Sequence, residues 1–119
     1  MHAVDTNILA RYFRLDDERQ SAIAAAVMAR GTVYCPKTVL VEFEMVMRYV
    51  YEHSREEIAA CMEALINLHN TALEDEQHVA DAMRHYRAGL DFADAMHLAS
   101  SHRCEVLATF DKKFSKRAA

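Results

Sequence analysis

The chain has 119 residues, of which 52% are hydrophobic and 27% charged, and it carries a net charge of −4 at pH 7. This length predicts one compact domain over residues 1–119, and the composition excludes a disordered chain. Charged residues interrupt every apolar stretch before it could cross a bilayer, and the first residues lack the features of a signal peptide. We therefore expect a cytoplasmic protein with no membrane contact.

The first half of the chain predicts two short strands and three helices. A buried strand over residues 1–4 precedes a short helix, and a second helix ends just before Gly31, which suits a C-terminal cap. Pro36, the only proline, separates the second strand from a long helix. In chain order, these predicted elements cover about residues 1–4, 8–13, 18–30, 32–35 and 38–52.

The second half predicts three more helices and two more strands. Ser54 and Glu57 have the spacing of a capping box at the start of a helix, and Gly89 suits a left-handed cap at the end of another. In chain order, these elements cover about residues 54–69, 71–73, 76–88, 91–102 and 105–109. The alternation predicts the α/β class, with three α/β/α layers around a short, mostly parallel sheet of four or five strands.

Two aspartates follow predicted strands. Asp5 comes directly after the first strand, and Asp111 comes just after the last. Sites in open α/β sheets form where the carboxyl ends of strands meet the following loops. Each aspartate also has a purely structural interpretation, because Asp5 could cap the next helix and Asp111 could shape a turn.

Glu42 and Glu44 differ on a helical wheel of about 100° per residue. Glu44 has Arg48 four residues later, which predicts an exposed ion pair away from a core stripe. Glu42 lies on the flank of that stripe with no basic residue at i+4. The stripe is predicted to consist of Val39, Phe43, Val46 and Val50. A carboxylate facing the edge of the core needs compensation, which a bound cation would supply.

Asp91 and Asp94 are spaced three apart at the start of a helix, which also suits a helix cap and an acid in the first turn. Together with Asp5, Glu42 and Asp111 they would form a cluster of mutually repelling carboxylates unless a hard cation were present. Oxygen-only ligands of this kind favour Mg²⁺ or Mn²⁺ over zinc. Neither the scattered histidines nor the three distant cysteines, Cys35, Cys61 and Cys104, predict a zinc site or a disulfide framework.

Four segments of the chain resemble, in order, the four successive motifs of PIN domains. They are Val-Asp-Thr-Asn-Ile-Leu at 4–9, Leu-Val-Glu-Phe-Glu at 40–44, Asp-Phe-Ala-Asp-Ala-Met-His at 91–97 and Thr-Phe-Asp-Lys-Lys-Phe at 109–114. Within that family the sequence is most similar to VapC toxins, which are metal-dependent endoribonucleases neutralised by a VapB antitoxin. The resemblance assigns the metal-binding and catalytic acids to Asp5, Glu42, Asp94 and Asp111. Asp91 is a candidate for a further metal ligand, or else an outer or capping group. Thr6 and Thr109 adjoin these acids and suit a supporting role.

The resemblance implies hydrolysis of RNA phosphodiester bonds by a water activated by Mg²⁺, for which Mn²⁺ is a substitute. It also implies a homodimer and a VapB-like antitoxin in the groove beside the acids. The apolar residues Ile8, Tyr12, Phe13 and Met47, if exposed, are candidates for these contacts, although core packing is the more common role for any one of them. The net charge disfavours general attraction to nucleic acid, so RNA contact requires local basic residues. Our candidates are Arg11, Arg14, Lys112, Lys113 and Lys116, although the basic segment 112–117 could equally be a solvated, frayed terminus.

Two other functions fit parts of the sequence. A phosphoacceptor receiver domain has a similar length and acidic residues at strand ends, but it needs a lysine before a late proline, and Pro36 is the sole proline. A PIN-like scaffold that binds partners without catalysis is the second alternative. Metal-dependent cleavage of an RNA pool would separate these functions from a nuclease.

Overall fold

The computed structural model describes residues 1–14 and 16–101, which divide between two compact units, Met1–Glu74 and the described part of Asp75–Ala119. Within these residues the chain has six helices and three strands. Of the described helices, none combines the length and the apolar character that crossing a membrane would require.

The first unit is built on a parallel sheet. Strands β1 (His2–Ala3), β2 (Val33–Cys35) and β3 (Thr71–Leu73) are arranged in the order β1-β2-β3, and both neighbouring pairs are parallel. In the register, Ala3 lies opposite Tyr34 and Tyr34 lies opposite Ala72. Parallel neighbours require crossover connections, which helices supply here. The predicted α/β class and parallel sheet are confirmed, whereas the strand predicted at 105–109 lies outside the described residues.

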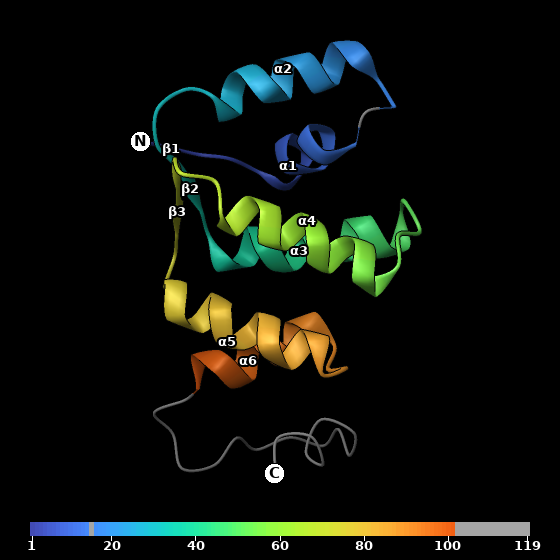
Figure 1. Cartoon of the computed structure of the whole chain (residues 1–119), viewed down its shortest axis with the longest axis vertical. Helices are drawn as coiled ribbons and strands as arrows, with labels where there is room; N and C mark the ends of the chain where they lie inside the picture. The colour runs from blue at the N-terminus through green and yellow to red at the C-terminus, as the bar shows by residue number, and fades with distance from the viewer. Residues whose placement is uncertain (15, 102–119) are drawn as a thin grey trace. The chain divides into compact units, whose positions relative to one another are not determined.

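Two helix pairs make these crossovers. Helices α1 (Thr6–Phe13) and α2 (Glu18–Met28) connect β1 to β2, and α3 (Lys37–Tyr49) and α4 (Arg55–Ile66) connect β2 to β3. The members of each pair run side by side (Figure 1). The fully buried side chains of this unit include Leu9, Val33, Leu40, Phe43, Met47, Ile58, Met62 and Leu65. Burial of these apolar surfaces is the main contribution to the stability of the unit.

The second unit contains a helix pair, α5 (Glu76–Arg87) and α6 (Phe92–Ser100), which lie against each other (Figure 1). The rings of Tyr86 and Phe92, one from the end of α5 and one from the start of α6, meet edge to face at 5.3 Å between centroids. Both side chains are almost fully buried. An aromatic pair of this geometry adds about 0.5–1.5 kcal/mol beyond its buried area, so it helps to fix the turn between the helices.

The predicted capping box at the start of α4 is present. The Ser54 hydroxyl accepts a hydrogen bond from the Glu57 amide at 3.1 Å, and the Ser54 amide donates to Glu57 Oε1 at 2.9 Å. Hydrogen bonding of the Ser54 amide to the Glu57 carboxylate, with smaller contributions from the Ser54 hydroxyl and His53, lowers the pKa of that carboxyl from its usual 4.5. The charged form of Glu57 is therefore favoured by folding.

We expect Glu57→Gln to remove a pH-dependent part of the stability. Because the pKa of Glu57 is lower in the folded chain, its contribution is complete above the usual value of 4.5 and is lost as the pH falls through the lowered pKa. Thermal melts of the parent and the variant should therefore differ near neutral pH and converge in acid. Glu56→Gln, at the neighbouring exposed position, controls for loss of a charge in the first turn. Equal pH dependence in the two variants would contradict the prediction.

Gly89 ends α5 as the sequence predicts. Its φ is +109°, its amide donates to the Tyr86 carbonyl at 3.0 Å, and the Leu90 amide donates to the His85 carbonyl at 3.1 Å. This pair of bonds is the Schellman arrangement, which satisfies carbonyls that the helix end leaves unpaired. A side chain at this φ would be strained.

Gly89→Ala is expected to destabilise the chain by about 1–2 kcal/mol, because alanine disfavours positive φ. Gly31→Ala is the matched control. Gly31 has a φ of +58°, in the ordinary left-handed region, and a Cβ there would meet no atom within 4 Å. Urea denaturation should show the larger loss for Gly89→Ala, and a loss no greater than that of Gly31→Ala would refute the cap assignment.

Candidate active site

Asp5 lies at the carboxyl end of β1, where the sequence predicts it. Its side chain is exposed and caps α1, because Oδ1 accepts a hydrogen bond from the Ile8 amide at 3.1 Å. The capping role considered for Asp5 is therefore confirmed. Because the cap uses Oδ1 alone, it does not exclude a second role for this carboxylate in binding a metal. Oδ2 has no hydrogen-bond partner among residues 1–14 and 16–101, so this carboxylate retains an oxygen that could bind a cation.

Thr6 lies directly beside Asp5. Its side chain is 5% exposed, and its Oγ1 has no hydrogen-bond partner in the described part of the chain. A buried hydroxyl without a partner costs free energy, so native proteins usually provide one from a side chain, a water or a ligand. The Thr6 hydroxyl, next to Asp5, therefore needs a hydrogen-bond partner from outside the described residues, such as a water or a ligand.

Glu42 lies in the second turn of α3 and is exposed. The predicted core stripe of this helix is wrong apart from Phe43, because the buried residues are Leu40, Phe43, Glu44 and Met47, and Val50 is 65% exposed. Glu42 therefore faces solvent and not the edge of the core. No described residue forms a hydrogen bond or an ion pair with Glu42, which leaves its carboxylate accessible to a ligand.

The prediction of an exposed Glu44 is also wrong, although its predicted ion pair is present. Arg48 Nη2 lies 3.0 Å from Glu44 Oε1, but the Glu44 side chain is only 1% exposed. Burial of a carboxylate requires a paired cation and further hydrogen bonds. The guanidinium of Arg48 supplies that charge and also stacks over the Tyr49 ring, 4.4 Å from its centroid.

Asp91 and Asp94 belong to the second unit. Asp91 is the N-cap of α6 and accepts a long hydrogen bond, 3.4 Å, from the Asp94 amide. Both side chains are half-buried. The capping role considered for Asp91 is therefore confirmed, and Asp94 occupies the first turn of α6, where a negative charge complements the helix dipole.

The predicted site residues are divided between the two units and the part of the chain that the structure does not describe. Asp5 and Glu42 lie in the first unit, Asp91 and Asp94 lie in the second, and Asp111, Thr109, Lys112, Lys113 and Lys116 lie outside the described residues. Within residues 1–14 and 16–101, no three His, Cys, Asp or Glu side chains form a group that could hold a metal ion. The assignment of the acidic quartet therefore remains a prediction.

Glu74 is an acid at the end of a strand that the sequence analysis missed. It follows β3, its amide donates to the Cys35 carbonyl at 3.1 Å, and its Oε1 accepts from the Lys37 amide at 3.0 Å. The N-cap of α3 is Pro36, which provides no capping side chain. Glu74 supplies the missing acceptor from a strand distant in sequence. Its position after the third strand was the signal that could have revealed it.

Arg11 and Arg14 differ in how firmly their charges are held. Arg14 contacts Asp16 at 3.1 Å and His53 Nε2 at 2.9 Å, and it stacks 3.9 Å above the Tyr51 ring. The hydrogen bond from Arg14 is the main reason that the pKa of Asp16 is lowered. Arg11 lies 3.8 Å from Asp16, its one ion pair with a described residue. Arg14 is therefore held by local structure, whereas Arg11 is the better candidate to meet a ligand.

The apolar candidates for partner contacts are mostly packed within the chain. Met47 is buried, which corrects its expected exposure. The rings of Tyr12 and Phe13 meet at 5.1 Å, and the ring of Phe13 lies 5.8 Å from that of Phe43. Ile8 remains half-buried at a pocket between α1 and α2.

The described cysteines do not provide a nucleophile. Cys35 and Cys61 are free thiols, and burial raises the pKa of Cys35 to about 11. Burial, together with the charge of Glu57, also raises the pKa of Cys61. Both thiols are therefore protonated near neutral pH, and the thiolate is the reactive form.

Comparison with known proteins identifies the family of the chain. The family model of the PIN domain matches residues 3–119, which is nearly the whole sequence. No curated protein and no solved structure gave a significant match. PIN domains are generally nucleases and typically use divalent metal ions, and the observed helices and parallel sheet agree with a PIN-like α/β fold. The chain belongs to the PIN domain family.

Proposed function

We propose that this chain is a Mg²⁺-dependent endoribonuclease that acts as the VapC-type toxin of a toxin–antitoxin pair. The observation that carries the proposal is the match to the PIN domain over residues 3–119, with Asp5 exposed at the carboxyl end of β1. That position is where open α/β sheets form their sites. A cytoplasmic homodimer and a VapB-like antitoxin belong to the same proposal.

The donor chemistry fits a hard divalent cation. Asp5 and Glu42 are exposed carboxylates with oxygens not engaged by described residues, and the buried Thr6 hydroxyl beside Asp5 calls for a partner. We assign the ligands to Asp5, Glu42, Asp94 and Asp111, which supply only oxygen and so suit Mg²⁺ or Mn²⁺. When bound, the ion supplies Lewis acidity for phosphodiester hydrolysis.

The side chains around these acids have separate tasks. The Thr6 hydroxyl can hold a neighbouring carboxylate or a water by a hydrogen bond, as groups around a metal site commonly do. Asp91 fixes the start of α6 and thereby positions Asp94. Arg11 provides positive charge in the first unit for an RNA phosphate.

Cleavage of a mixed RNA pool tests this proposal directly. The parent should cut RNA with Mg²⁺, stop when EDTA is added and recover when Mg²⁺ or Mn²⁺ is restored. The products should carry 5′-phosphate and 3′-hydroxyl ends. A folded protein that binds RNA or a partner without cutting under any of these conditions would be a scaffold, and the nuclease proposal would be wrong.

A further inference from the structure

A pocket of about 390 Å³ lies between α1 and α2 in the first unit. Its walls are Asn7, Ile8, Arg11, Gln20, Ile23 and Ala24. Its volume is within the range of pockets that hold small molecules. Apart from the phosphate contact proposed for Arg11 and the partner contact considered for Ile8, the roles assigned above do not use this space.

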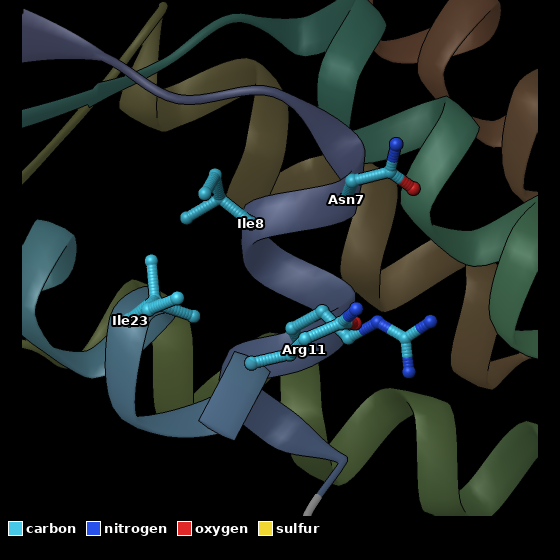
Figure 2. Close-up of a pocket in the computed structure, with 6 residues that line it drawn as sticks. Asn7, Ile8, Arg11 and Ile23 are labelled. Atoms are coloured by element: carbon cyan, nitrogen blue, oxygen red, sulfur yellow. The ribbon is translucent and has the colours of Figure 1, made fainter. Parts of the chain in front are cut away.

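The walls are apolar on one side and polar on the other. Figure 2 shows Ile8 of α1 and Ile23 of α2 pointing toward one another, while Asn7 and Arg11 extend on the opposite side of α1 from Ile8. Ile23 is 55% exposed, so its side chain is accessible to a ligand. A ligand that fits this pocket therefore combines an apolar surface for the isoleucines with polar groups for the side chains of the other wall.

The side-chain amides of this pocket are not used by the fold. The side-chain amides of Asn7 and Gln20 have no hydrogen-bond partner among the described residues. In a second pocket of about 320 Å³, by contrast, the Asn70 amide donates to the carbonyls of Met28 and Gly31 at 2.7 and 2.9 Å. That second pocket therefore has its amide committed to structure, whereas the pocket between α1 and α2 offers its amides to a ligand.

The pocket also adjoins the proposed site within a single helix. Ile8, one of its walls, donates its amide to Asp5 at 3.1 Å. Arg11 lies one further turn along α1, a rise of about 5 Å. A ligand that occupies the pocket is therefore close to whatever Asp5 binds.

We propose that this pocket holds one unstacked base of a single-stranded RNA, beside the phosphodiester that Asp5 faces; the inference rests on the ribonuclease function proposed above. Sequence-specific proteins bind splayed-out bases of single strands by packing the faces and hydrogen-bonding the edges. Ile8 and Ile23 pack against the base, and the amides of Asn7 and Gln20 each offer the donor and the acceptor that a base edge needs. Arg11 contacts a phosphate or the base face. An apolar helix of a protein partner would leave these three polar groups poorly matched.

The test uses Gln20→Ala with Ile23→Ala, since both residues are exposed on α2 and lie outside the proposed metal ligands. In an Asp94→Asn background, binding of a short fluorescent single-stranded RNA is measured by anisotropy without Mg²⁺. The double variant should bind roughly tenfold more weakly, which corresponds to about 1.4 kcal/mol of binding free energy. In the Asp94-containing protein, the same changes should alter the base preference at one position beside the cut. Gln77→Ala with Val50→Ala, two exposed positions that do not line the pocket, is the matched control.

The outcomes separate this inference from the proposed function. Affinity and base preference equal to those of the control, in a protein that still binds and cuts RNA, would overturn the base pocket alone. No binding and no cleavage by the parent would overturn both proposals. Unchanged RNA binding combined with weaker self-association in sedimentation would assign the pocket to a protein interface and also overturn the inference.

Discussion

Asp94→Asn is expected to reduce Mg²⁺-dependent RNA cleavage by more than about a hundredfold, because loss of a group that merely supports a metal ligand already costs about 10- to 100-fold. Asparagine keeps the size of the side chain but removes the negative charge that a hard cation requires. Folding should survive. The change removes a favourable charge from the first turn of α6, which costs about 0.3–1 kcal/mol.

Asp91→Asn is the matched control for this variant. Asp91 caps α6, and asparagine is as good an N-cap as aspartate, so the stability should barely change. Its activity should fall only modestly. The measurements are cleavage rates across Mg²⁺ concentrations and thermal melts for the parent and both variants. Near-normal cleavage by Asp94→Asn, or total loss confined to Asp91→Asn, would show that the metal ligand had been assigned to the wrong aspartate.

The second large expected effect is on cleavage and stability, in which substitutions of Glu42 and Glu44 on α3 should differ. Glu42→Gln should abolish cleavage and leave stability within about 0.5 kcal/mol, because the side chain is exposed and makes no ion pair with a described residue. Glu44→Gln should lower the stability of the chain and leave RNA cleavage intact. It removes the negative charge that lies 3.0 Å from Arg48 at a position that is 1% exposed.

Breaking a fully buried ion pair costs about 3–5 kcal/mol. Because Arg48 remains partly exposed, we expect about 1–3 kcal/mol for Glu44→Gln, or a drop in Tm of several degrees. Cleavage is compared at low temperature, where both variants are folded, and stability is taken from urea denaturation. If Glu44→Gln is fully folded but does not cleave RNA, while Glu42→Gln is still active, then the metal ligand on α3 is Glu44 and not Glu42.

Much of the fold was predictable because its signals are local. The order of helices and strands, the capping box of Ser54 and Glu57, and the cap at Gly89 all depend on residues within a few positions of each other. The parallel sheet followed from the alternation of short strands with helices. The position of Asp5 at a strand end was likewise set by its immediate neighbours.

The buried face of α3 was decided by tertiary structure. A helical wheel places Glu42 and Glu44 relative to each other, but the packing of α1 and α4 against α3 determines which stripe is covered. That packing buries Glu44 and leaves Glu42 and Val50 in solvent. The pairing with Arg48 makes this burial tolerable, and no local preference predicted it.

By itself, the sequence determined the class of fold, the element order and the acidic residues at the family motifs, because these depend on local periodicity and on residue type. Only the tertiary structure decided that Glu74 caps α3 through the Lys37 amide, across 37 positions of sequence, and that α1 and α2 leave a pocket beside Asp5. The reason is physical. Contacts between distant segments depend on the packing of whole elements, which the periodicity of a single element does not encode.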